Sequence, residues 1–476
     1  MQQIIFSFDT EDFVTPESDD ALKAIARILR RRGIRASFAL VGDKARALWT
    51  RHRKDVIDEV RWHDIQYHAN THMMWPVTTL ELSRMKWDEG VDFVMQTERH
   101  GIEDVAEVFD QRPRAYIRCG GNWDPRELYG MHLLGIEAHV PSRATLPAGI
   151  PDAVGAGLSC VLPAWYVNVL NYGYNFPIER YFRPEFPLAR LRADFTALRQ
   201  ALTGKPIPIV VYAHPCTFVT SKFYDLHNQR RRGVFPTKEK WRPAPLLPPY
   251  EARRRLAVLD ELARWVTSQR DLKIITHSEF IDAHREKSRW LPLHAVVALA
   301  RTVLTDDLHW CQVGRGYLSP AEVFGALSLA LVAWRREGTL PKRLPVRRLI
   351  GPPESARALS RAFPVPAVVV ADACAQVERE IDLQHRMPAA VTVRGQRVPP
   401  ASFLTAMAKA VLQVSARGGG NVTVGPRAPF PRCQAELFAE VKVGSSELPQ
   451  DFKPGTITTY THLQTWTMRP ATPQRG

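Results

Sequence analysis

The order of apolar and polar positions along the first part of the chain predicts strands and helices in turn. Residues 3–8 form a short apolar run with β-branched and aromatic side chains, which indicates a buried strand. Apolar side chains then recur at helical spacing up to Gly33, at Leu22, Ile25, Ile28 and Leu29. The next expected elements are a strand at 34–41, a helix at 43–60 and a short strand at 65–67. This alternation predicts parallel strands joined by right-handed crossovers.

The same pattern continues as far as residue 285. A helix is expected within 79–109, and further strands at 115–118, 136–140, 160–162, 209–213 and 273–276. We therefore expect an α/β fold, a distorted (β/α) barrel, over residues 1–285. Barrels of this kind place their chemistry at the carboxyl ends of their strands.

Side chains that can bind a metal follow the first and third expected strands. Asp9, Glu11 and Asp12 end the first strand, and His68 and His72 stand four positions apart after the third. On a helical turn, both imidazoles would project from one face. Two imidazoles and one carboxylate make a plausible catalytic zinc site, and a second carboxylate could act as a base. Taken alone, each of these two groups has a simpler interpretation. The acidic residues could cap a helix, and the histidines could have a structural role.

Five segments, taken in order, resemble the motifs of one enzyme family. They are Ser-Phe-Asp-Thr-Glu-Asp at 7–12, Ile-Arg-Ala-Ser-Phe-Ala-Leu-Val-Gly at 34–42, His-Ala-Asn-Thr-His at 68–72, Tyr-Ile-Arg-Cys-Gly-Gly at 116–121 and Ile-Val-Val-Tyr-Ala-His at 209–214. Together they resemble the polysaccharide deacetylase family, that is, the NodB-homology domain or carbohydrate esterase family 4. The resemblance covers roughly residues 1–285 and implies a barrel of the NodB-homology type.

The resemblance also implies roles for individual residues. Asp12, His68 and His72 would hold a divalent metal, with Zn²⁺ as the expected ion and Glu11 as the alternative to Asp12. Asp9 would be the catalytic base, Arg118 would orient it, and His214 would protonate the leaving amine. The loop at Gly120, Gly121, Asn122 and Trp123 would contact the substrate.

The sequence departs from the family pattern in three places. The usual adjacent aspartates are spread into Asp-x-Glu-Asp, and Cys119 stands where proline is common. We find no good match to the family's fourth motif, so the partner of His214 is unassigned. His277, after the next strand, competes with His214 for the role of acid.

The segment between Pro215 and Pro249 is rich in proline, arginine and aromatic residues. Because it directly follows His214, it could form a lid or a wall beside the substrate. An ordered loop packed on the rim of the barrel is an equally good reading.

The pattern beyond residue 285 predicts a smaller, mainly helical region at 286–417 and an irregular segment at 418–476. The stretches 340–346 and 387–393 share a Pro-x-x-apolar-x-Val pattern at an offset of 47, which suggests an internal repeat. It weakly resembles the pseudomurein-binding repeat, which implies a cell-wall polymer as a possible partner. A structural helical appendage is the alternative.

Composition limits the class of protein. The chain has 476 residues, of which 45% are hydrophobic, and its 64 Lys and Arg against 49 Asp and Glu give a net charge of +15. We interpret these charges as scattered on helix faces, so nucleic acid is not the expected partner. The six cysteines lack Cys-x-x-Cys spacing, and no apolar run is long enough to span a bilayer. The first strand leaves no room for a signal peptide, so a cytoplasmic protein is expected.

The leading interpretation is a metal-dependent hydrolase that removes acetyl groups from an N-acetylated sugar or glycan, with metal-bound water as the nucleophile. One alternative is a C–N hydrolase of a small non-sugar amide on the same fold. Another is a non-catalytic glycan-binding protein. Release of acetate from chito-oligosaccharides would separate the first from the second, and metal content would separate the enzymes from the third.

Overall fold

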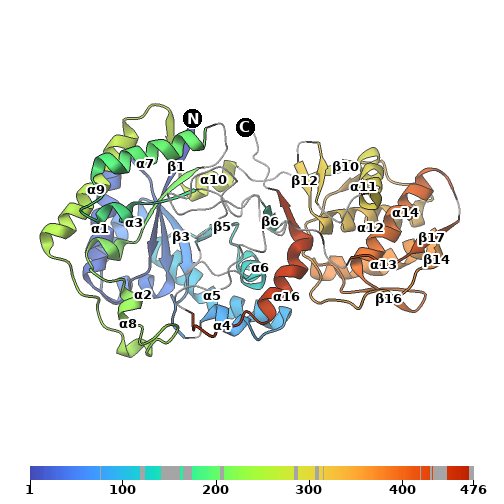
Figure 1. Cartoon of the computed structure of the whole chain (residues 1–476), viewed down its shortest axis with the longest axis horizontal. Coiled ribbons are helices and arrows are strands. Elements are labelled where there is room, and N and C mark those ends of the chain that lie inside the picture. The colour runs from blue at the N-terminus through green and yellow to red at the C-terminus, as the bar shows by residue number, and fades with distance from the viewer. Residues whose placement is uncertain are drawn as a thin grey trace.

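The computed structural model contains a part built on a sheet, at the left of Figure 1, and a helical part at its right. The residues that it describes are 1–75, 77–117, 124–140, 161–163, 174–203, 208–283, 288–305, 310–314, 316–418, 420–428, 431 and 448–470.

A parallel sheet forms the centre of the first part. Its strands lie in the order β5-β4-β3-β2-β1-β8-β7, and β9 pairs with the start of β1. Every pairing in this sheet is parallel. The bounds are β1 Gln2–Thr10, β2 Ser37–Val41, β3 Asp64–Ala69, β4 Ala115–Ile117, β5 Ala138–Val140, β7 Tyr174–Pro177, β8 Ile209–Ala213 and β9 Leu272–Ile274. The predicted α/β fold with crossover connections is confirmed.

One expected strand has a different partner. The strand predicted at 160–162 corresponds to β6, Val161–Pro163, which pairs antiparallel with β18, Met468–Pro470. It therefore does not belong to the barrel sheet, and the expectation that it does is wrong.

Helices surround the sheet (Figure 1). They are α1 Glu17–Arg31, α2 Gly42–Thr50, α3 Lys54–Arg61, α4 Thr78–Leu82, α5 Trp87–Phe109, α6 Pro125–Leu133, α7 Leu188–Ala201, α8 Tyr224–Asn228, α9 Pro249–Thr267 and α10 His277–Ala283. The predicted apolar stripe of α1 is buried, with Leu22, Ile25 and Leu29 at 0% exposure. Each such side chain contributes roughly 1.5–3 kcal/mol by leaving water. The single helix expected at 43–60 is two helices, because His52 between them has a left-handed φ of 54°.

The register of the sheet brings the ends of three strands together. Phe8 of β1 lies opposite Ala213 of β8, so Asp9 and His214, one residue further along, reach the same level. On the other side of β1, Asp9 lies opposite Ala39 of β2, and Leu40 lies opposite Tyr67 of β3. The residues that follow β1, β3 and β8 therefore meet at the carboxyl edge of the sheet.

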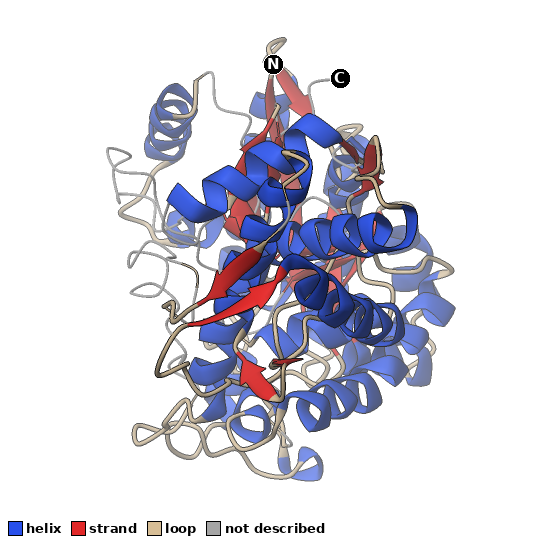
Figure 2. Cartoon of the chain, turned by 90° about the vertical axis from the view of Figure 1, so that its right-hand side faces the viewer, coloured by secondary structure: helices blue, strands red, loops and turns tan. Residues whose placement is uncertain are grey.

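The helical part has a core of its own. It contains β10 Trp290–Pro292, α11 Leu293–Thr305, β11 Cys311–Val313, β12 Gly316–Leu318, α12 Pro320–Glu337, β13 Arg343–Pro345, β14 Phe363–Pro366, α13 Ala367–Gln384, β15 Val391–Val393, β16 Gln396–Val398, α14 Pro400–Ser415 and β17 Asn421–Val424. Figure 2 faces this part and shows its helices with short strands between them.

The helical part is built from two units with the same order of elements. Each unit is a strand, a helix, a hairpin, a helix and a strand, and its outer strands pair antiparallel, β10 with β13 and β14 with β17. The hairpins begin at Cys311 and Val391 and the second helices at Pro320 and Pro400, an offset of 80 residues, whereas the first helices begin at Leu293 and Ala367, 74 residues apart. The internal repeat is therefore present, but the offset of 47 is wrong because it matches β13 of one unit to β15 of the other. Binding of a cell-wall polymer by these units remains a prediction.

The last described segment, 448–470, returns to the first part of the chain. It holds α16 Thr456–Leu463, the short helix η6 Gln464–Thr467 and β18, within a region expected to be irregular. Leu448 is 1% exposed and packs against Met73 and Val77. The Thr456 hydroxyl bonds the carbonyl of Leu82 at 2.9 Å. Figure 1 shows α16 between the two parts of the chain. In the described part of the chain, the helices are too short or too polar to cross a bilayer.

Candidate functional site

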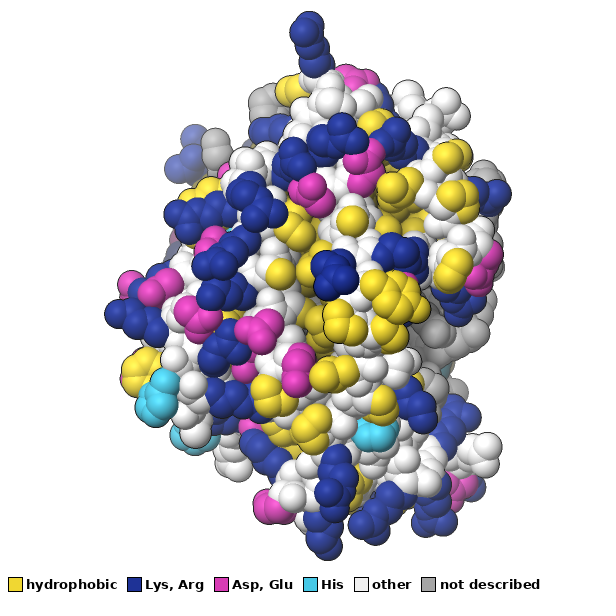
Figure 3. Space-filling view, turned by 90° about the vertical axis from the view of Figure 1, so that its left-hand side faces the viewer, with side chains coloured by type: hydrophobic (Ala, Val, Ile, Leu, Met, Phe, Trp, Pro, Cys, Tyr) yellow, Lys and Arg dark blue, Asp and Glu magenta, His cyan; other side chains and the backbone are white. Residues whose placement is uncertain are grey.

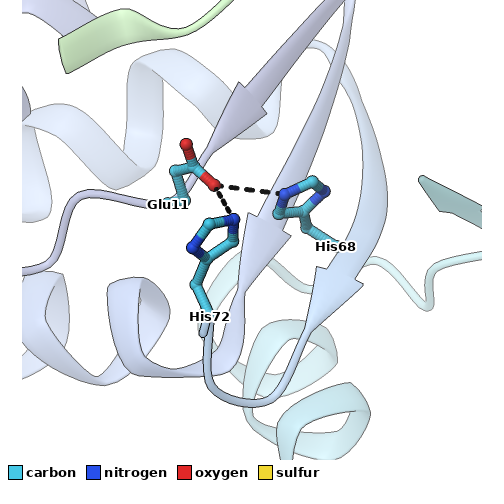
Figure 4. Close-up of side chains that lie close together, drawn as sticks. All are labelled: Glu11, His68 and His72. Carbon is cyan, nitrogen blue, oxygen red and sulfur yellow. Dashed lines mark hydrogen bonds and ion pairs between the residues drawn. The ribbon is translucent and has the colours of Figure 1, made fainter. Parts of the chain in front are cut away.

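Glu11, His68 and His72 converge at the carboxyl edge of the sheet (Figure 4). Glu11 Oε2 lies 3.2 Å from His68 Nε2 and 2.6 Å from His72 Nε2. All three side chains are buried, and their ligand atoms lie within 4.8 Å of one another. Two imidazole nitrogens and a carboxylate oxygen at this spacing match the donor set of a catalytic zinc site.

The sequence suggested that the two histidines share a helical turn, but in the structure they do not. His68 lies in β3, and His72 lies in the bend that follows, where Met73 has a φ of 35°. Asn70, between them, donates its backbone N–H to Glu98 Oε2 at 2.8 Å and its side-chain amide to the Thr97 carbonyl at 2.7 Å. Both partners are on α5, so this helix holds the bend and brings the two imidazole rings to 5.4 Å, nearly parallel.

Asp12, which the sequence favoured as the metal carboxylate, is not part of this group. Its Oδ1 accepts the backbone N–H groups of Val14 and Thr15, both at 2.9 Å, and Lys44 Nζ bonds its carbonyl at 2.6 Å. The Asp12 side chain therefore closes the turn before α1, and Glu11, the alternative, faces the histidines.

The group fits a cation. Within the described residues, the buried atoms Asp9 Oδ1 and Glu11 Oε1 have no hydrogen-bond partner. Burial opposes ionisation of Glu11, but His72 and His68 outweigh it and hold the pKa of Glu11 well below its usual range. The pKa of Asp9 is raised, because its burial outweighs the nearby His68 and His214. A divalent ion would satisfy these oxygen atoms and favour their charged forms.

His214 lies beside this group, as its position after β8 predicts. Its Nε2 is 3.7 Å from Glu11 Oε1 and 3.9 Å from Asp9 Oδ2, and it contacts the Tyr212 hydroxyl at 2.9 Å. His277, the competing candidate, contacts Ser7 Oγ at 3.0 Å instead, and burial lowers its pKa to about 3. His214, and not His277, is therefore the histidine that lies beside the Glu-His-His group.

Glu179 is the partner of His214 that sequence reasoning missed. Its Oε1 lies 2.9 Å from His214 Nδ1 and accepts the backbone N–H of His214 at 2.8 Å. Burial lowers the pKa of His214, but Glu179, Glu11 and Asp9 outweigh it and raise that pKa to about 10. Glu179 lies two residues after β7. Its position just beyond a strand is the sequence feature that could have identified it.

The segment after His214 forms an ordered wall on the site, which we call the wall segment, 215–249. Its Phe223 ring lies 4.8 Å from the His214 ring, and Asp225 Oδ2 lies 3.4 Å from His72 Nδ1. Asp225 is fully buried, and together with Glu11 it raises the pKa of His72 well above its usual value, against the effect of burial. A metal-binding histidine that is held at its other nitrogen keeps a fixed orientation.

The remaining predicted residues cannot be placed. Arg118 and the loop Gly120, Gly121, Asn122 and Trp123 lie outside the described residues. Their proposed roles, orienting Asp9 and contacting the substrate, stay predictions.

Comparison with known proteins bears on the fold alone. No protein-family profile and no curated protein matches the sequence. Among solved structures, a 4-alpha-glucanotransferase from Thermococcus litoralis matches with 15% identity and a TM-score of 0.38, over 59% of this chain and 40% of that one. The chain thus spans well under half of that enzyme.

Members of carbohydrate esterase family 4, whose motifs the sequence resembles, are also among the matches. An esterase of this family from Streptomyces lividans has 10% identity and a TM-score of 0.31, over 60% of this chain and 97% of that one. A pseudoenzyme of the family from Bacillus anthracis has 12% identity and a TM-score of 0.30, over 60% and 67%. At these values we draw no functional conclusion from the matches, and we base the function on the site.

Proposed function

We propose that this protein is a metal-dependent hydrolase that removes the acetyl group from an N-acetylated sugar or glycan. One observation carries the proposal. A candidate acid, His214, and a candidate base, Asp9, lie next to a buried Glu-His-His group that can hold a metal. A metal ion, a general base and a general acid together supply the functions that metal-dependent hydrolysis of an amide uses.

Glu11, His68 and His72 would hold the ion, which we propose to be zinc. When bound, a divalent ion polarises the acyl oxygen of the substrate and makes water more acidic. The donors are two imidazoles and a carboxylate, a set that suits zinc better than calcium or magnesium, which prefer ligands that are all oxygen.

The two flanking side chains would divide the proton transfers between them. Asp9 takes a proton from the attacking water as the new C–O bond forms. His214 gives its proton to the amine nitrogen as the C–N bond breaks, so the products are acetate and a free amino sugar. The pKa of His214, raised to about 10, keeps the ring protonated at neutral pH.

Tyr212 and Glu179 support His214 in this role. The Tyr212 oxygen can accept the Nε2 proton at 2.9 Å, and Glu179 can accept the Nδ1 proton at the same distance. Glu179 therefore fixes the ring through Nδ1, and Nε2, the nitrogen that faces Glu11 and Asp9, gives its proton to the amine in place of its bond to Tyr212.

Acetate release from chito-oligosaccharides by the zinc-loaded protein tests the proposal. We expect Asp9→Asn and His214→Gln each to lower the rate by roughly 10²–10⁴ while zinc stays bound. His277→Gln is the matched control, because it changes a buried histidine outside the site and should keep the activity. No acetate from the wild type with either neutral or anionic N-acetylated oligosaccharides, or loss of activity only in His277→Gln, would overturn the proposal.

A further inference from the structure

Exposed cations gather on the wall segment, next to the proposed site. Five of them, the cationic rim, are exposed and make no ion pair with the described residues: Lys222, Arg230, Arg231, Lys240 and Arg242. Lys238, on the same segment, differs because it pairs with Asp43. Figure 3 shows Lys and Arg side chains over much of one face, including its lower end, the end at which α8 lies in Figure 1.

The rim belongs to the same segment that touches the candidate catalytic residues. Lys222 precedes Phe223, whose ring lies 4.8 Å from His214. Between Phe223 and Arg230 the chain places Asp225 against His72. The cations therefore lie on the same segment as Phe223 and Asp225, and Lys222 directly adjoins a residue that contacts the site.

Hydrogen bonds fix the shape of the rim. The backbone N–H of Arg230 bonds the Val234 carbonyl at 2.9 Å, and the N–H of Val234 bonds the Arg231 carbonyl at 2.8 Å, which closes a tight turn. Gly233 permits this turn with a φ of 72°, and it lies so close to Pro449 that a side chain would not fit.

The two halves of the rim are tied to each other as well. The Asn228 amide donates to the Arg242 carbonyl at 2.9 Å, and the Arg242 N–H donates to Asn228 Oδ1 at 2.8 Å. Asn228 thus joins the stretch that carries Arg230 and Arg231 to the stretch that carries Arg242, and an anion bound along these like charges would reduce the repulsion between them.

We propose that the substrate is an anionic glycan, an N-acetylated polymer or oligosaccharide that also carries carboxylate, phosphate or sulfate groups. Those groups lie on the cationic rim while the acetamide reaches the site. A neutral polymer of N-acetylglucosamine has no anionic group that could pair with these five cations. The proposal rests on the proposed function and names the class of glycan on which it acts.

Calorimetric titration of the zinc-loaded, full-length protein tests this proposal. The probes are a hyaluronan hexasaccharide, which is N-acetylated and anionic, and chitohexaose, which is N-acetylated and neutral. We expect the anionic probe to bind at least tenfold more tightly at low salt, and to lose most of that advantage at about 0.5 M salt.

The double variant Arg230→Gln/Arg231→Gln should lower affinity for the hyaluronan probe about tenfold and leave chitohexaose unchanged. The matched control is Arg31→Gln/Arg270→Gln. It makes the same charge change at exposed positions that precede β2 and β9, at the opposite edge of the sheet, and it should bind as the wild type does.

Three results would overturn the proposal: equal affinity for the two probes, equal loss in both double variants, or a six-nucleotide thymidine oligomer that binds as tightly as hyaluronan. Acetate release is measured in parallel. If hyaluronan binding depends on Arg230 and Arg231 but neither probe releases acetate, recognition of an anionic glycan stands and the proposed hydrolysis fails.

Discussion

Replacing Asp225 by asparagine tests whether the wall segment helps to hold the metal. Asp225 is fully buried, and its Oδ2 lies 3.4 Å from Nδ1 of His72, on the side of the ring away from Glu11. The substitution keeps the shape of the side chain and removes the charge that orients and polarises the imidazole.

The size of the effect follows from the distance. Partners of metal-binding histidines typically contribute 10–100-fold to metal affinity. Because 3.4 Å is longer than the ~2.7–2.9 Å of a strong charge-assisted hydrogen bond, we expect the lower end, a loss of about tenfold, or ~1.4 kcal/mol.

Competition between the protein and a chromogenic zinc chelator measures this affinity. The matched control is Tyr224→Phe, which removes a buried hydroxyl from the neighbouring residue and keeps the ring that packs 6.0 Å from the His72 ring. Wild-type affinity in Asp225→Asn would refute the reasoning. An equal loss in Tyr224→Phe would refute it too, because packing of the wall would then be the cause.

Two further predictions concern histidines. Glu179→Gln should lower the pKa of His214, so acetate release should fall and its basic limb should move to lower pH, with zinc content unchanged. His63, whose Nδ1 accepts the Ala36 N–H and whose Nε2 donates to the Ala26 carbonyl, has a pKa lowered to about 4 by burial. The unfolded chain binds a proton at His63 more readily than the folded chain does. The free energy of unfolding, measured by urea denaturation, should therefore drop by roughly 3 kcal/mol from pH 6.5 to 4, and by less in His63→Gln.

The order of strands and helices could be read from the sequence because their apolar patterns are local. The run at 3–8 and the stripe of α1 are buried as their spacing predicts. The register of a parallel sheet then places residues after neighbouring strands at one edge, which is why Asp9, His68 and His214 were found together. The repeat in the helical part was detected from the sequence. Its offset was wrong because the short Pro-x-x-apolar pattern occurs at β13, the last strand of the first unit, and at β15, in the hairpin of the second unit.

The choice between Glu11 and Asp12 shows where such reasoning stops. Side chains alternate along an extended chain, so Glu11 lies on the same side as Asp9, whereas Asp12 is free to cap the next turn. That signal was in the sequence and was outweighed by motif matching. Glu179 and Asp225 had no comparable signal, since each reaches its histidine through loop geometry that spacing does not reveal.

The zinc content of two matched variants tests the central claim most directly. Glu11→Gln and Asp12→Asn each neutralise one of two neighbouring buried carboxylates, and only Glu11 contacts the histidines. After reconstitution, elemental analysis should find about one zinc per chain in the wild type and in Asp12→Asn, and much less in Glu11→Gln. Loss of zinc in Asp12→Asn with retention in Glu11→Gln, or no zinc in the wild type, would contradict the site described here.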